Sequence, residues 1–174
     1  MTLQNAIALI QHPGIGETAS AQWADLGCGS GLFTFALASQ LQPGSHIYAA
    51  DKSAGVLEKH ANPHKIGIEF IQLDFVQASL PFKELDGILM ANALHFVAEK
   101  TAFIKKLTGH LKKTGRFLLV EYDTDKPNRW VPYPTSIQTL QLLFAAAGYG
   151  SFELLGQLPS VYNTARLFGA LIKK

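Results

Sequence analysis

Cysteine and charge are both scarce in this sequence. Its 174 residues include one cysteine, Cys28, so the chain can form neither an internal disulfide nor a metal site built from several of its own thiolates. Charged residues make up 16% of the chain and the formal net charge is only +2, so no broad basic surface indicates a nucleic-acid partner. We therefore expect a protein of a reducing compartment and do not expect nucleic acid among its partners.

Long apolar runs are also missing. No stretch approaches the roughly 20 apolar residues that cross a bilayer, and residues 1–10 lack the basic leader and cleavage site of a signal peptide. We expect a soluble, cytoplasmic protein that does not associate with a membrane. Hydrophobic residues nevertheless make up 48% of the chain, enough for a continuous core, and no repeat or linker divides it. The prediction is one domain, 1–174, in which 1–20 form an N-terminal helix and lead-in.

Short apolar runs alternate with segments of helical spacing, which favours a parallel sheet covered by helices on both faces. Strands are predicted at 22–26, 46–50, 68–73, 85–90, 116–122, 152–158 and 166–173. Helices are predicted at 1–11, 32–41, 53–60, 99–113 and 135–147. The last two strands should form an antiparallel pair at one edge, and the proline-containing segment 123–134 should be a loop. The lysines near the end of the helix at 99–113 are expected on its solvated face: Lys105, Lys106, Lys112 and Lys113.

A glycine-rich turn follows the first predicted strand and carries the clearest indication of function. It comprises Asp25, Gly27, Cys28, Gly29 and Gly31, and a helix follows it. Glycines let the backbone turn sharply and approach a ligand closely, while the helix presents free amide donors. The dinucleotide pattern G-x-G-x-x-G fails here because its last position falls on a leucine, which disfavours a nicotinamide oxidoreductase.

A second stretch, 14–19, does match the dinucleotide pattern formally. However, it follows a predicted helix and precedes a strand, which reverses the order that dinucleotide binding requires. We therefore interpret 14–19 as a loop with two glycines.

The turn at 25–31 resembles the first motif of the class I S-adenosylmethionine-dependent methyltransferases. Further segments agree with that family in order: Asp51 after the second strand, Asp74 and Phe75 after the third, 86–96, and 111–120. The resemblance implies a three-layer, Rossmann-like α/β methyltransferase fold. Its seven-stranded sheet would be mostly parallel, with an antiparallel edge strand and helices on both faces.

The same resemblance assigns cofactor contacts. Asp51 would take both ribose hydroxyls, with Lys52 beside it, while Asp74 would accept the adenine amino group. Phe75 would cover an adenine face. The methionine end of S-adenosylmethionine would lie near Asn92 and Asp25, where a carboxylate suits its ammonium group directly or through water. The glycines Gly27, Gly29 and Gly31 would approach the cofactor, and Cys28 is interpreted as a small packed residue of the turn rather than a nucleophile.

The acceptor side is predicted at the same edge of the sheet. His95, after the fourth strand, has a titration range suited to a general base, but it could equally hydrogen-bond backbone at a helix entry, so its role stays open. Candidate walls of an acceptor pocket are Tyr122, Arg129, Trp130 and Tyr133, although the last three could instead pin down a proline-rich loop. The histidines show no metal-ligand spacing, so no metal is expected.

Several functions fit these residues. The leading hypothesis is methyl transfer from S-adenosylmethionine to a small-molecule acceptor, with S-adenosylhomocysteine as the product. A protein or RNA acceptor is the alternative within the same class. A non-catalytic subunit that binds S-adenosylmethionine is the alternative outside it. The sequence does not decide whether the chain forms a homodimer.

Overall fold

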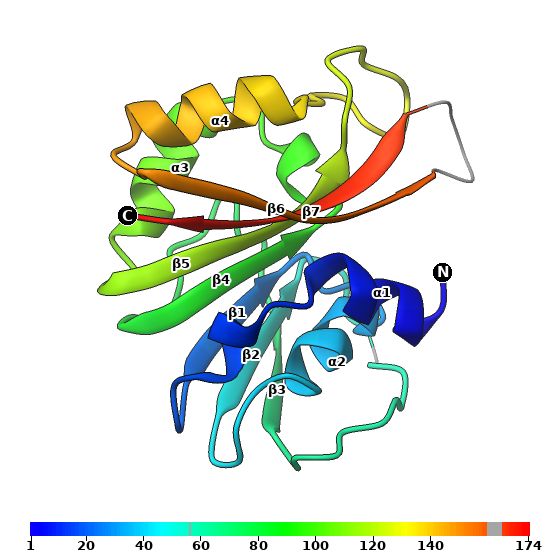
Figure 1. Ribbon diagram of the computed structural model, residues 1–174, viewed down its shortest axis with the longest axis vertical. Helices are drawn as coiled ribbons and strands as arrows, with labels where there is room; N and C mark the ends of the chain where they lie inside the picture. Colours follow the sequence, from blue (N-terminus) through cyan, green and yellow to red (C-terminus); the bar gives the residue numbers. More distant parts are fainter. Residues whose placement is uncertain (56, 160–164) are drawn as a thin grey trace.

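Seven strands form one sheet in the computed structural model, which describes residues 1–55, 57–159 and 165–174 (Figure 1). The strands are β1 (Gln22–Leu26), β2 (His46–Asp51), β3 (Gly67–Gln72), β4 (Leu85–Ala91), β5 (Leu111–Tyr122), β6 (Ser151–Pro159) and β7 (Arg166–Lys173). Their order across the sheet is β3-β2-β1-β4-β5-β7-β6. The order reverses beside β1, which is where open α/β sheets bind ligands.

Five neighbouring strands run parallel, and β7 runs antiparallel to both of its neighbours, β5 and β6. The predicted antiparallel pair at one edge is therefore confirmed. The reversed strand itself is second from the edge, because β7 is inserted between β5 and β6.

Helices cover both faces of the sheet (Figure 1). α1 (Leu3–Ile10) and α2 (Leu32–Ala38) pack on one face, where their apolar residues share a core with Trp23, Ile47 and Leu118. α3 (Lys100–Thr108) and α4 (Ile137–Ala146) pack on the other, around Phe117 and Phe168. Single 3-10 turns lie at Pro13–Gly16 and Leu94–Phe96. The predicted three-layer arrangement is confirmed, and no helix among the residues placed in the structure is long and apolar enough to span a bilayer.

The helix predicted over 53–60 is wrong, because the described residues of this segment form bends and coil. Its backbone bonds to the glycine turn instead of to itself: the Glu58 amide donates to the Ser30 carbonyl over 2.8 Å. The His60 ring packs edge-on against Phe35 of α2, with ring centroids 5.4 Å apart. Contacts with the turn and with α2 therefore replace the local bonds of a helix.

The helix predicted over 99–113 is too long, and its lysines do not share one solvated face. Helix α3 ends at Thr108, and Lys112 lies in β5, where its Nζ pairs with the Asp86 carboxylate at 2.8 Å. Lys106 Nζ donates to the carbonyls of Phe75, Val76 and Ala78. The solvated-face interpretation is therefore wrong for these two residues, because Lys106 binds backbone carbonyls and Lys112 pairs with a carboxylate of the neighbouring strand β4.

Candidate functional site

The glycine turn connects β1 to α2 at the carboxyl ends of the parallel strands. The amides of Gly27 and Cys28 both donate to the Ala50 carbonyl of β2, at 2.7 and 3.1 Å. Gly27 has φ +83° and a side chain there would lie 2.7 Å from the Ala93 Cβ, so this position requires glycine. Gly29 also has positive φ, but a Cβ there would meet no atom of the described residues within 4 Å. The turn therefore packs closely at its first glycine, whereas no described residue packs against its second.

Asp51 ends β2 and ties the turn to the next loop. Its Oδ2 accepts from the Gly29 amide at 3.0 Å, and its Oδ1 accepts from the Ser53 amide at 2.9 Å. Each carboxylate oxygen has two acceptor positions, so both retain one for a ligand. Two backbone bonds thus orient a carboxylate that still has accepting capacity.

Most of the predicted cofactor residues border one cleft of about 350 Å³, which we call the turn cleft. Its lining residues are Gly27, Asp51, Lys52, Asp74, Phe75, Val76, Gln77, Asn92, Ala93 and Phe96. Asp74 caps the following backbone, since its Oδ1 accepts from the amides of Val76 and Gln77 at 3.0 and 3.3 Å. Carboxylates at the ends of two strands and an aromatic ring therefore surround the same space.

Asp25 lies beneath the turn and does not line this cleft. Its side chain is fully buried, and its Oδ2 accepts from the Thr34 hydroxyl at 2.6 Å. Its Oδ1 is buried with no hydrogen-bond partner among the described residues. Burial raises the pKa of Asp25 to about 7, the Thr34 hydrogen bond opposes this, and the Asp51 charge adds to it.

Cys28 is buried within the turn, consistent with its interpretation as a packing residue. Burial raises the pKa of its thiol, and the negative charges of Asp25 and Asp51 raise it further. The thiol therefore stays protonated and is a poor nucleophile.

Asn92 stands where the cavities of this edge meet. It adopts φ +53°, an unusual conformation for a residue other than glycine, and its backbone amide donates to the Val120 carbonyl at 2.8 Å. Its Oδ1 is buried with no hydrogen-bond partner in the described part of the chain. Asn92 lines the turn cleft and two further cavities.

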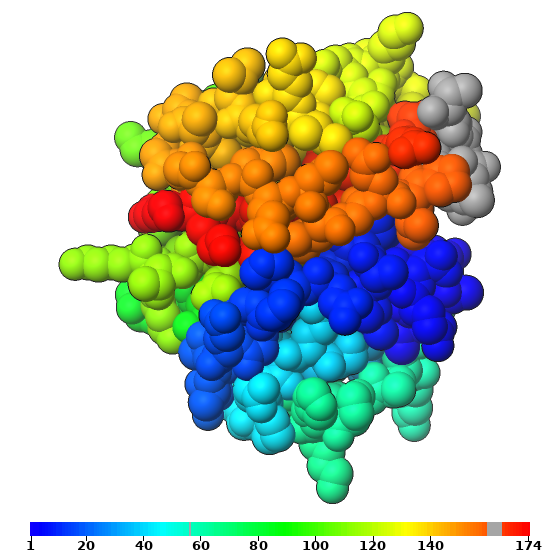
Figure 2. All heavy atoms as spheres, in the orientation of Figure 1, coloured from blue at the N-terminus to red at the C-terminus, as the bar shows by residue number. Residues whose placement is uncertain are grey.

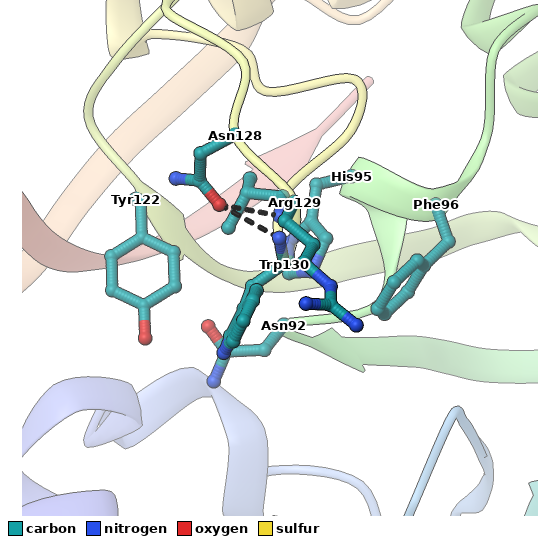
Figure 3. Close-up of a pocket in the computed structure, with 8 residues that line it drawn as sticks. Asn92, His95, Phe96, Tyr122, Asn128, Arg129 and Trp130 are labelled. Atoms are coloured by element: carbon teal, nitrogen blue, oxygen red, sulfur yellow. Dashed lines mark hydrogen bonds between the residues drawn. The ribbon is translucent and has the colours of Figure 1, made fainter. Parts of the chain in front are cut away.

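The largest of these cavities, about 750 Å³, lies beside the turn cleft and is called the His95 cavity below (Figure 3). It is lined by Asn92, His95, Phe96, Tyr122, Asn128, Arg129, Trp130 and Val131. Tyr122 and Asn92 reach it from the ends of β5 and β4, and Trp130 from the loop after β5 (Figure 3). Asn128 shapes that loop, because its Oδ1 accepts from the amides of Trp130 and Val131 at 2.8 and 3.0 Å.

A buried carboxylate holds His95 in place. Glu121 Oε2 lies 2.7 Å from His95 Nδ1, and Glu121 Oε1 accepts from the His95 amide at 3.2 Å. The two residues are 4% and 3% exposed. Glu121 was not predicted from the sequence, although an acidic residue directly after the apolar run 117–120 of a buried strand indicates a paired or functional group.

Tyr133 does not join the other predicted acceptor residues. Its carbonyl accepts from Lys100 Nζ at 2.6 Å, and the Lys100 ammonium lies 5.9 Å from its ring centroid. Tyr133 therefore helps to bury Lys100 and does not line the His95 cavity. Phe96 does line it and was not predicted; its side chain is 53% exposed, so it lies at the rim.

A third cavity of about 520 Å³ lies on the α1 side and shares Asn92 and Tyr122 with the His95 cavity. Its other lining residues are Met1, Thr2, Asn5, Leu32, Phe33, Leu158, Pro159 and Leu167. The three cavities thus converge on Asn92. No group of three or more His, Cys, Asp or Glu side chains placed to hold a metal ion occurs among residues 1–55, 57–159 and 165–174.

The strand order, the reversed β7 and the glycine turn together define the class I methyltransferase fold. A family model described as a methyltransferase domain matches residues 24–119, which is more than half of the chain. The chain belongs to this methyltransferase family, as the order of its sequence motifs predicted.

Individual relatives agree with this assignment. A demethylmenaquinone methyltransferase from Symbiobacterium thermophilum is 32% identical over 105 residues, covering 56% of this chain. The chain spans only 41% of that relative's length.

Solved structures share the fold at low sequence identity. A 1,6-didemethyltoxoflavin-N1-methyltransferase from Burkholderia thailandensis, solved with bound 1,6-didemethyltoxoflavin and S-adenosylhomocysteine, has a TM-score of 0.72 and 18% identity. The match covers 99% of this chain and 77% of that one. A SAM-dependent methyltransferase from Methanosarcina mazei has a TM-score of 0.71 and 18% identity, covering 95% and 99% of the two chains.

Proposed function

We propose that this chain binds S-adenosylmethionine in the turn cleft and transfers its methyl group to a small molecule in the His95 cavity, forming S-adenosylhomocysteine. The observation that carries the proposal is the convergence of the two cavities on Asn92. A donor on one side of this residue and an acceptor on the other would meet there. Holding two reactants in this way supplies most of what a displacement reaction needs from a protein.

The residues present fit the cofactor. Asp51 retains acceptor positions for a ribose diol, while Asp74 and Phe75 border the same cleft with a carboxylate and an aromatic face. The buried Oδ1 of Asn92 has no donor among the described residues, and the ammonium of a bound amino acid moiety would supply one. No described residue fills the space at Gly29, as a ligand passing close to the backbone requires.

The reaction requires little of the protein beyond the alignment of donor and acceptor. S-adenosylmethionine supplies a methyl group already activated by a sulfonium. Asp51 and the glycine turn would orient the donor, Asn92 would position its methionine end, and the walls of the His95 cavity would hold the acceptor and exclude water.

The size of the His95 cavity favours a small acceptor. At about 750 Å³ it falls within the range of small-molecule sites, and aromatic side chains form much of its wall. The demethylmenaquinone and didemethyltoxoflavin methyltransferases, by their names, also act on small molecules. A protein or RNA acceptor would need an open groove beside the donor rather than a cavity bordered by a folded loop.

Substitution of Asp51 tests cofactor binding. Asp51→Asn should weaken both S-adenosylmethionine and S-adenosylhomocysteine by at least about tenfold, or about 1.4 kcal/mol. The amide removes a charge and turns an NH₂ group toward a backbone donor or a ribose hydroxyl. Isothermal titration calorimetry measures the effect, and NAD should produce no heat of binding.

Glu69→Gln is the matched control, because Glu69 lies on the neighbouring strand β3 and pairs with His46 outside the cleft. It should leave both affinities unchanged. Folded wild-type protein that binds neither sulfur compound would overturn the proposed function.

A further inference from the structure

We propose that His95 is the general base of the transfer and that Glu121 is its positioning residue, so that the acceptor is an aromatic compound bearing an ionisable O–H or ring N–H. This inference rests on the proposed function and adds the class of acceptor. Two contacts of the Glu121 carboxylate carry it, one with the His95 imidazole and one with the His95 backbone amide.

Glu121 holds His95 at two points. One oxygen accepts from the backbone amide at 3.2 Å and the other lies 2.7 Å from Nδ1, so both the backbone and the ring plane are constrained. A carboxylate only accepts hydrogen bonds, so Nδ1 carries the proton in this pair. The nitrogen left with a lone pair is Nε2, and His95 is one of the residues that line the cavity. This is the arrangement that a base needs to take a proton from a bound molecule.

Two cationic side chains, Lys100 and Arg129, lie near the pair. Lys100 is buried near the Glu121 carboxylate; burial lowers the pKa of Lys100, and the Glu121 charge opposes that shift. The Lys100 ammonium donates to the carbonyls of Val97 and Tyr133, so it does not compete for Glu121 as a direct partner. On the open side, the groups that share the cavity with the imidazole are the Tyr122 phenol and the Arg129 guanidinium.

Aromatic surfaces line the space in front of His95. The Phe96 ring lies 4.4 Å from the imidazole, and the Tyr122 ring lies 6.4 Å away, centroid to centroid. Trp130 is 63% exposed at the rim, with the Arg129 guanidinium 5.1 Å from its ring centroid. Flat rings suit such walls, and the guanidinium favours an acceptor that becomes negative as it loses its proton.

The step balances without a further reactant. As the acceptor oxygen or nitrogen forms its bond to the methyl carbon, Nε2 takes the acceptor proton. The carbon–sulfur bond breaks with its electron pair going to sulfur. His95 is left as an imidazolium next to the Glu121 carboxylate and returns the proton to solvent. Base catalysis of this kind typically contributes about 10² to 10⁴ in rate.

Two phenols of different acidity test the inference. At about pH 8, 4-nitrophenol is largely ionised, whereas 4-methylphenol retains its proton much as tyrosine does. Wild-type protein with S-adenosylmethionine should methylate both. His95→Gln should lower kcat on 4-methylphenol at least about 100-fold, but by less than about tenfold on 4-nitrophenol, which needs no base.

Glu121→Gln should lower kcat on 4-methylphenol while changing KM little, because the amide keeps the shape of the side chain but loses the charge. Imidazole ¹⁵N spectra give a second readout: they should show the wild-type His95 proton on Nδ1, and this preference should be lost in the Glu121 variant. His46→Gln, on β2 and outside the His95 cavity, is the control and should alter neither phenol's rate.

Two results would overturn the inference: equal losses on both phenols in the His95 variant, or an imidazole protonated on Nε2. Binding of S-adenosylmethionine without methylation of either phenol by wild type would overturn the acceptor class alone. Absence of cofactor binding in calorimetry would instead overturn the proposed function, so the two failures are distinguishable.

Discussion

Asp25 is a buried carboxyl at the glycine turn, and its protonation makes this part of the molecule sensitive to pH. It lies under the glycines with one oxygen bonded to Thr34 and the other without a partner among the described residues. Burial is the largest cause of its raised pKa, followed by the opposing Thr34 bond and the added Asp51 charge. The protonated carboxyl is therefore favoured at acidic to neutral pH, and a nearby cationic ligand would favour ionisation instead.

The raised pKa has a definite consequence for stability. The folded-state value of about 7 exceeds the ordinary 3.8, so the folded protein binds this proton more tightly than the unfolded chain. The free energy of unfolding should therefore fall as pH rises from about 4 to about 7, by up to about 4 kcal/mol from this group. Asp25→Asn should remove this part of the pH dependence, as measured by urea unfolding at about pH 5 and pH 8.

Glu17→Gln serves as the control, since this exposed carboxyl should leave the slope unchanged. In the absence of ligand, the Asp25 variant should gain stability relative to wild type on going from pH 5 to pH 8. A variant whose curve parallels that of wild type would show that Asp25 ionises normally.

Some residues of the site could be predicted from the sequence and others could not. Asp51, Asp74 and Phe75 could be predicted because the family's motifs place acidic residues at the ends of successive strands, and parallel strand ends share one edge. Glu121 could not be predicted in the same way. Its partner His95 is distant in sequence, and only the pairing of β4 with β5 brings the two together.

At the scale of elements, the packing of α1 against the sheet depends on a glycine in β7. In Figure 2, β6 crosses the visible surface between α4 and α1, and α1 lies directly beside it. A Cβ on Gly169 of β7 would come within 1.8 Å of the Leu9 carbonyl oxygen in α1. The helix thus rests on the sheet backbone itself at this point.

Gly169→Ala should therefore destabilise the protein by about 3 kcal/mol, because a backbone clash can only be relieved by moving the whole helix. Chemical unfolding monitored by circular dichroism measures the loss. Gly150→Ala is the matched control, since a Cβ there would meet no atom within 4 Å, and it should change stability by less than about 0.5 kcal/mol. Equal effects of the two substitutions would contradict the packing described.

Element boundaries were harder to predict than element types. The strands at 22–26 and 46–50 were located closely because each is a short apolar run bounded by turn residues. The helix at 53–60 was wrong because the polar pattern there could not reveal bonds to a distant turn. The lysines at 112 and 113 extended a helical spacing that the strand pairing of Leu85 with Leu111 overrides.

At the scale of the whole molecule, the site is a property of the sheet edge. Glycine turn, strand-end carboxylates and the loop after β5 come from separate parts of the chain, and they converge because parallel strands end together (Figure 1). A ligand that contacts several of these parts at once should raise the free energy of unfolding of the whole domain.

Saturation with S-adenosylhomocysteine at about 100 times its Kd should add about 2.7 kcal/mol to the free energy of unfolding. For a chain of this size that corresponds to a rise in Tm of about 5 to 10 °C. Differential scanning calorimetry measures the shift, with NAD at equal concentration as the control. A rise of similar size with NAD would contradict the specificity proposed for the turn cleft.

The sequence by itself determined the fold class, the glycine turn and the acidic residues that follow the strands, because these depend on local periodicity and on motifs in fixed order. Only the tertiary structure decided that Asp25 is buried beneath the turn, that Glu121 holds His95, and that Tyr133 faces Lys100 instead of the cavity. Such contacts join residues that are far apart along the chain, so burial and charge at these positions are set by strand pairing and loop packing, which no local pattern encodes.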